Sequence, residues 1–190
     1  KELGADEIIT DQLREEVIQK AIEMYHEGNP GHNYDNRYNV YATFKGEGGR
    51  SIMFNGHIDN LPAENEEAWD SPPLQPIVKD GKMHGIGICD MKSGLMASIM
   101  AVELLKDAGV KLPGDVKIVS VVDEEGGGNG SIAAAMNGQR ADAVVVCEPT
   151  NYELIAAHMG FVFFKVEVSG VAVHSGLKLS GVNAIEKAAK

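Results

Sequence analysis

The sequence predicts an α/β fold in which helices flank a largely parallel sheet. Strand-like apolar runs alternate with amphipathic helical segments along most of the chain, which is the order of a parallel sheet with crossover helices. The run Val116–Val122 is almost continuously apolar, as expected for a strand covered on both faces. At Gly160 the pattern changes to an apolar run that ends in strict alternation. We therefore expect one domain over residues 1–159 and the beginning of a second, cut short, over 160–190.

The first half of the chain alternates clear periodic segments with glycine- and proline-rich breaks. Apolar side chains at helical spacing precede the break at Gly28–Asn33, and four of the seven prolines fall in one later stretch. These patterns indicate turns and irregular loops between regular elements. The elements expected here are a helix over 12–25, strands over 39–44 and 51–55, a loop over 60–76 and a hairpin over 77–83.

The second half begins with the clearest helix, Ser93–Ala108. Leu95, Ile99 and Val102 lie on one helical face, and Gly109 stands where a C-terminal cap belongs. The elements expected after it are strands over 116–122, 143–147 and 154–157, a helix over 131–136, an alternating strand over 161–168 and a helix from about Val182.

Composition excludes several classes of protein. The formal net charge of −11 argues against a nucleic-acid partner, which usually requires a clustered basic surface. No run approaches the roughly 20 apolar residues of a membrane span, so no membrane partner is expected. Cys89 and Cys147 are 58 positions apart, which is neither a disulfide framework nor a zinc motif. A reduced, cytoplasmic protein fits these features best.

Two polar clusters follow strands in the first half of the chain. His57 and Asp59 lie just beyond the strand over 51–55 and suit a metal-bound imidazole oriented by a carboxylate. Alone, the pair is more typical of a structural histidine. The segment from Gly85 to Asp90 begins like a dinucleotide fingerprint, but Asp90 occupies the third glycine position. A carboxylate there repels a pyrophosphate and attracts cations, and its two oxygens can bridge two ions.

Two further acidic clusters follow the later strands. In Asp123-Glu124-Glu125, neighbouring side chains on an extended backbone point in opposite directions, so Glu125 can hold a metal while Glu124 faces an attacking water. A solvated acidic loop is the alternative. Glu148 ends the strand over 143–147. Since ligands of open α/β sheets bind beyond the carboxyl ends of the strands, the four clusters are expected to converge on one zinc site, with two metals if a carboxylate is shared.

These motifs resemble those of the M20 metallopeptidases in order and spacing. They are Gly56–Pro62, Gly85–Lys92, Asp123–Gly130 and Glu148–Thr150, and the resemblance covers the chain from about residue 36 onward. The family includes acetylornithine deacetylase, succinyl-diaminopimelate desuccinylase, aminoacylases and carboxypeptidases. The resemblance implies a zinc-exopeptidase-like catalytic domain over 1–159 and an α+β lid and dimerisation domain beginning at 160.

The resemblance also implies a role for each site residue. His57, Asp90 and Glu148 would bind one Zn²⁺, and Asp90 and Glu125 a second, with Co²⁺ or Mn²⁺ as other possible metals. Asp59 would orient His57, and a cis peptide would follow Asp90. Glu124 would be the general base that takes a proton from the attacking water. His174 would reach from the lid to the active site of the partner subunit and stabilise the oxyanion.

The expected activity is removal of an acyl group from a small N-acyl amino acid, with acetylornithine as the reference substrate. Cleavage of a peptide by a dipeptidase or carboxypeptidase is the first alternative, and a metal-binding protein without catalysis is the second. The family's last ligand to the second metal is a histidine far downstream of residue 190. We therefore expect the 190-residue segment alone to be inactive, and the full-length protein to be a homodimer.

Overall fold

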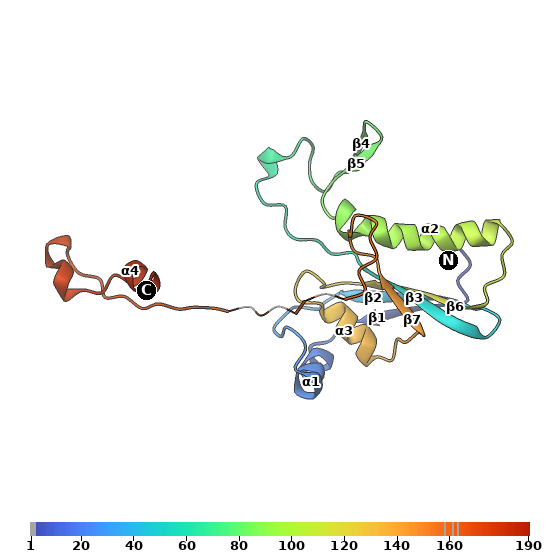
Figure 1. The fold of residues 1–190 in the computed structure, drawn as a ribbon, viewed down its shortest axis with the longest axis horizontal. Helices are drawn as coiled ribbons and strands as arrows, with labels where there is room; N and C mark the ends of the chain where they lie inside the picture. Colours follow the sequence, from blue (N-terminus) through green and yellow to red (C-terminus); the bar gives the residue numbers. More distant parts are fainter. Residues whose placement is uncertain (1–2, 158, 161, 163) are drawn as a thin grey trace. The chain divides into compact units, whose positions relative to one another are not determined.

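A five-stranded mixed sheet organises the larger part of the chain (Figure 1). The computed structural model describes residues 3–157, 159–160, 162 and 164–190 and divides into two units, Lys1–Tyr152 and Glu153–Lys190. In the first unit the strand order is β1 (Glu7–Gln12), β2 (Tyr38–Phe44), β6 (Gly114–Val121), β3 (Gly49–His57) and β7 (Ala143–Val146). The pairs β1–β2 and β2–β6 are antiparallel, whereas β3 runs parallel to both β6 and β7.

Helices cover both faces of this sheet. Figure 1 shows α2 (Ser93–Asp107) on one face and α1 (Glu15–Tyr25) and α3 (Asn129–Met136) on the other. Strand β6 is buried from both sides, because Ile118 packs in the cluster with Leu95 and Val102 of α2, while Val121 packs in a second cluster with Ala134 of α3. This alternation is the period of two that a strand imposes. The predicted fold class, a helix-flanked sheet with parallel central strands, is confirmed.

Most predicted elements are present, with two differences in this unit. The hairpin is formed by β4 (Ile77–Lys79) and β5 (Lys82–His84), and Glu66–Ala68 adds one helical turn to the loop before it. Strand β1 was not predicted, and helix α1 consequently begins after it, at Glu15 rather than at residue 12. Most of β1 is exposed, so it has no apolar alternation that would indicate a strand. Cys89 and Cys147 are both free cysteines.

The predicted strand over 154–157 is wrong. Residues 153–157 have no regular structure, although Leu154 and Ile155 are apolar. Leu154 is 93% exposed and Ile155 is 59% exposed, so nothing covers these side chains in the part of the chain that the structure describes. Without a covering layer or a neighbouring strand, an apolar run gains little from an extended conformation.

The second unit contains short elements. A helical turn spans Ser175–Ser180 and α4 spans Ala184–Ala188, which confirms the helix expected from about Val182. The side chain of Asn183 caps α4 by accepting from the N–H groups of Ile185 and Glu186. Of the strand predicted over 161–168, Phe161 and Phe163 lie outside the described residues, and the other positions form no strand. A strand needs a paired neighbour, and Val171 with Val182 forms an isolated bridge. Over the described residues, no helix has the length and apolar character required to cross a membrane.

Candidate metal centre

The candidate site is built around His57, the last residue of β3. This strand lies between β6 and β7, both parallel to it, so the segments that follow the three strands meet at one edge of the sheet. The His57 side chain is 1% exposed. Gly56 precedes it, and a Cβ atom there would lie 3.2 Å from side-chain atoms of both Leu95 and Met91. The absence of a side chain at Gly56 therefore allows α2 to pack closely behind the histidine.

The two ring nitrogens of His57 face different groups. Nδ1 lies 3.0 Å from the backbone oxygen of Asp59 and 3.5 Å from its carboxylate. Nε2 lies 3.1 Å from Asp90 Oδ1 and 3.8 Å from Glu124 Oε2. Donation from Nδ1 to the backbone oxygen leaves Nε2 directed at the acids, which is the orientation that a metal-binding histidine needs. Asp59 thus holds the ring through its carbonyl group more closely than through its carboxylate.

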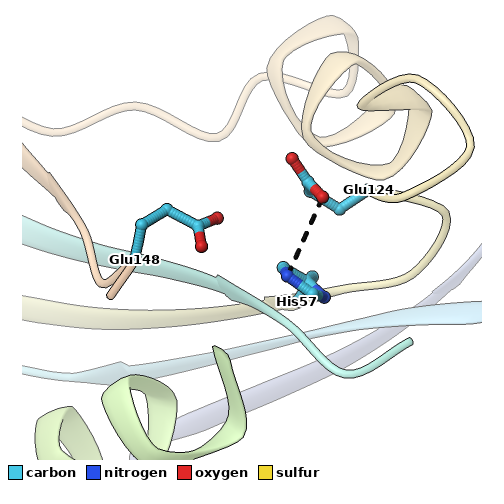
Figure 2. A group of neighbouring side chains, drawn as sticks. All are labelled: His57, Glu124 and Glu148. Carbon is cyan, nitrogen blue, oxygen red and sulfur yellow. Dashed lines mark ion pairs between the residues drawn. The ribbon is translucent and has the colours of Figure 1, made fainter. Parts of the chain in front are cut away.

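The carboxylates reach His57 from three other segments. Asp90 lies in the turn Ile88–Lys92 before α2, and a cis peptide joins it to Met91, as the family resemblance implied. Glu124 and Glu125 follow β6, and Glu148 follows β7. Figure 2 shows the carboxylates of Glu124 and Glu148 facing the same space beside the His57 ring.

Two groups of candidate ligand atoms share His57. One consists of His57, Glu124 and Glu148, the other of His57, Asp90 and Glu125, and within each group the ligand atoms lie within 4.8 Å of one another. The structure therefore brings together all five predicted residues that carry ligands or the base, with Asp59 behind the histidine. Glu124 was expected to be the base rather than a ligand. A base must lie within reach of the water it deprotonates, so this position fits that role.

Burial and mutual repulsion raise the pKa values of two acids in this site. Burial, followed by the charge of Asp90, raises the pKa of Glu148 to about 7. Burial also raises the pKa of Glu124, although the charge of His57 opposes it. For His57, burial lowers the pKa, but the bond to Asp90 and the charge of Asp59 outweigh it and the pKa is raised. Carboxylates this close stabilise one another only with protons or cations between them.

The donor set fits a divalent metal. One imidazole nitrogen and several carboxylate oxygens are the ligands that catalytic zinc sites use, and Co²⁺ and Mn²⁺ accept the same atoms. Asp59 Oδ1 is buried and has no hydrogen-bond donor among the described residues, while Asp59 Oδ2 accepts from the N–H of Glu125 at 3.1 Å. Asp59 therefore places its negative charge directly behind both the histidine and the loop of Glu125.

The seventh predicted site residue, His174, belongs to the second unit. It directly precedes the helical turn Ser175–Ser180, and its Nδ1 accepts a hydrogen bond from the N–H of Gly176 at 3.1 Å. This bond is local to the turn. The role of His174 as an oxyanion ligand in a partner subunit stays a prediction.

A second polar cluster beside the site was missed in the sequence. Asp123, grouped there with the two glutamates, has its carboxylate bound to His32, Tyr34 and Asn129. His32 lies in the stretch Gly28–Asn33, which had indicated only a break after the first helix, and Tyr34 directly follows it. Three polar residues spaced through that stretch, Asn29, His32 and Asn33, were a signal that it makes specific contacts. A cavity of about 260 Å³ lies next to this cluster, lined by Asp59, Asp123, Glu125 and Arg37 among others.

The fold and the site together define a candidate metalloenzyme domain of the α/β class. Residues 53–190 match the model of peptidase family M20/M25/M40. The chain therefore belongs to the M20 family of peptidases, and the predicted family is confirmed.

Relatives with curated descriptions carry two kinds of name. The chain is 34% identical over 154 residues to a "Probable succinyl-diaminopimelate desuccinylase" of Staphylococcus aureus, covering 80% of this chain and 38% of the relative. It is 35% identical over 170 residues to an "N-formyl-4-amino-5-aminomethyl-2-methylpyrimidine deformylase" of Halalkalibacterium halodurans, covering 83% and 40%. The chain thus spans about two fifths of the length of these relatives.

Solved structures share the fold. A tripeptidase from Staphylococcus aureus aligns with a TM-score of 0.56 at 21% identity, covering 99% of this chain and 46% of that one. Human carnosine dipeptidase 1 aligns with a TM-score of 0.53 at 22% identity, covering 76% and 29%. At these identities the comparison supports the architecture of the domain.

Proposed function

We propose that this chain carries the metal centre of an amidohydrolase that removes an acyl group from an N-acyl amino acid. The observation that carries the proposal is the convergence of His57 with four carboxylates from three other segments. Membership of a peptidase family supports hydrolysis of an amide bond. The relatives named desuccinylase and deformylase support an acyl group as the part released.

The ligand roles in this proposal follow the resemblance to the family, and the meeting of these side chains around His57 supports them. His57, Asp90 and Glu148 would hold one Zn²⁺, and Asp90 and Glu125 would hold a second, with Co²⁺ or Mn²⁺ as alternatives. Bound ions of this kind lower the pKa of water and polarise the carbonyl of the substrate. Asp59 keeps Nδ1 of His57 occupied, so that Nε2 is available as a ligand.

Glu124 acts as the general base in this proposal. Its side chain is 41% exposed, and its carboxylate lies 3.8 Å from Nε2 of His57, so Glu124 borders the ligands while its side chain stays partly open to solvent. It takes a proton from the attacking water and returns it to the nitrogen of the leaving amine. The oxygen of that water bonds to the carbonyl carbon, the scissile C–N bond breaks as the nitrogen is protonated, and the acyl group leaves as a carboxylic acid.

The second unit would begin a lid in the complete protein. There His174 of one subunit would stabilise the oxyanion in the partner subunit of a homodimer. The expected ligand is a small N-acyl amino acid or peptide, and the net charge of −11 disfavours nucleic acid as a partner.

The test uses the full-length protein that contains this chain. N-acetyl, N-formyl and N-succinyl amino acids and a set of dipeptides are the substrates, and bound metal is measured by mass spectrometry. Glu124→Gln is expected to retain metal and to lose about 10²- to 10⁴-fold in kcat. Glu103→Gln, the same change on an exposed position of α2, is the matched control and should leave kcat unchanged.

The outcomes separate the alternatives. Equal rates for wild type and Glu124→Gln would remove Glu124 as the base. Turnover of dipeptides without turnover of acyl amino acids would favour a dipeptidase or carboxypeptidase. Bound metal with no hydrolysis of any substrate would favour a metal-binding protein without catalysis.

A further inference from the structure

The loop that carries Glu124 and Glu125 is anchored on both sides by one distant segment. On one side, the carboxylate of Asp123 lies 2.8 Å from Nδ1 of His32 and accepts from the hydroxyl of Tyr34 at 2.9 Å. On the other side, the backbone oxygen of Gly126 accepts from the side chain of Asn29 at 2.6 Å. The two glutamates thus lie between two anchor points, and both anchors are held by residues 29–34.

His32 connects the two anchors. Its Nε2 lies 3.3 Å from Nδ2 of Asn29, which is the same amide that donates to Gly126. With Nε2 accepting from Asn29, Nδ1 carries the proton and donates to Asp123. Both ring nitrogens are therefore used within the network. Its bond from His32 to Asp123 joins residues 91 positions apart in the sequence, and its bond from Asn29 to Gly126 joins residues 97 positions apart.

The network holds Asp123 in a backbone conformation that non-glycine residues rarely adopt. Asp123 has φ of 61°, in the left-handed region that non-glycine residues seldom occupy. Its backbone oxygen accepts from the N–H of Asn129, and the oxygen of Glu124 accepts from the N–H groups of Gly127 and Gly128. This turn sends the Glu124 carboxylate toward His57 and places the N–H of Glu125 on Asp59.

We propose that His32, with Asp123, is a positioning pair for the metal centre, which fixes the turn from which Glu124 and Glu125 reach His57. Among the described residues, the side chains of His32 and Asp123 show no hydrogen bond to His57 or to the other proposed ligands. It acts through the backbone of the turn, held at Asp123 and at Gly126. The expected effect on kcat rests on the proposed function, whereas the expected effect on metal affinity does not depend on the reaction.

A role in general packing would have different consequences. The side chains of His32 and Asp123 are 29% and 19% exposed, so neither is part of the apolar core. A buried tyrosine elsewhere provides the comparison: Tyr41 donates to Asp11 at 2.8 Å and contacts Asn39, much as Tyr34 donates to Asp123 and contacts Asn129. Tyr41→Phe therefore removes a similar bond without removing an anchor of the turn.

The first measurement is Co²⁺ affinity of the 190-residue chain by calorimetry, with folding checked by circular dichroism. His32→Ala is expected to weaken Co²⁺ binding about tenfold, the lower end of what loss of an outer hydrogen-bond partner costs a metal site. His32→Asn keeps a donor near the position of Nδ1 and should restore most of the affinity. Tyr41→Phe should bind Co²⁺ as the wild type does.

The second measurement is hydrolysis by the full-length protein, where His32→Ala is expected to lower kcat about tenfold at unchanged KM. Wild-type Co²⁺ affinity in folded His32→Ala would overturn the proposal, and so would an equal loss in Tyr41→Phe. Failure of both His32 variants to fold would also overturn it, because the pair would then be needed for the fold itself. If no substrate is hydrolysed but the Co²⁺ affinities change as expected, the positioning role stands and the proposed function fails.

Discussion

Replacing Gly94 with alanine is expected to disturb both the packing of α2 and the metal centre. Gly94 lies in the first turn of α2, where the helix backbone passes over Cys147, the residue before Glu148. A Cβ atom at Gly94 would overlap the carbonyl oxygen of Cys147 and would lie 2.9 Å from its Cβ and 3.0 Å from its carbonyl carbon. Most of these atoms are backbone, so the overlap is relieved only when the helix and the strand end move apart.

The size of the effect follows from two opposing contributions. Ordinary contact begins at 3.4 Å, so the Cβ–Cβ pair alone requires the helix to move by at least 0.5 Å, and the carbonyl oxygen requires more. Overpacking of this kind costs about 1–3 kcal/mol, while alanine gains about 1 kcal/mol over glycine in a helix. Because the overlap is with backbone, we expect a net loss of about 1–2 kcal/mol, or a fall in Tm of roughly 2–8 °C.

The assay is thermal unfolding followed by circular dichroism, together with Co²⁺ affinity by calorimetry. Gly160→Ala is the control, because an added Cβ there meets nothing within 4 Å and Tm should be unchanged. Since the required movement displaces the strand end that carries Glu148, Co²⁺ binding should also weaken in Gly94→Ala. A Tm for Gly94→Ala equal to or above that of the wild type would refute the close approach of α2 to Cys147.

Two further predictions concern protons and a buried amide. The pKa of Glu148 is raised to about 7 from the ordinary 4.5, so the metal-free site keeps a proton below pH 7 that a metal must displace. Zn²⁺ affinity should therefore rise as pH increases through about 7, with proton release seen by calorimetry in two buffers, and pH-independent affinity would contradict it. Asn39 is fully buried and bonds the N–H of Val122, the oxygen of Gly130 and the hydroxyl of Tyr41. Asn39→Ala removes all three bonds and leaves the N–H of Val122 without this acceptor. The change should lower the free energy of unfolding by about 2–3 kcal/mol, as urea unfolding would measure; a loss below about 0.5 kcal/mol would show that other groups replace the amide.

The elements that the sequence predicted well are those with a strong periodic signal. Helix α2 and strand β6 are covered by other elements and carry the apolar pattern of their period. Strand β1 was missed because it is an exposed edge, held by its backbone bonds to β2. The run 154–157 was predicted as a strand because it is apolar, but pairing depends on a neighbour that the local sequence does not describe.

The candidate site was also predicted only in part from the sequence. His57, Asp90, Glu125 and Glu148 were predicted as ligands because each follows a strand or lies in a turn near its end, and they lie together in the structure. The sequence grouped Asp123 with its acidic neighbours, whereas its carboxylate binds His32 and Tyr34. The close backbone contact of Gly94 with Cys147 was likewise absent from any local pattern.

The amino-acid order was sufficient to establish the fold class, the family and the identity of the residues at the candidate metal centre. These features depend on residue type and on spacing along the chain, both of which are local. The tertiary structure alone showed that Nδ1 of His57 meets the carbonyl of Asp59 and that His32 meets Asp123. A hydrogen bond is sensitive to differences of a few tenths of an ångström in the donor–acceptor distance and to the angle between the groups. For His32 and Asp123, this geometry arises only when segments 91 positions apart have packed against one another.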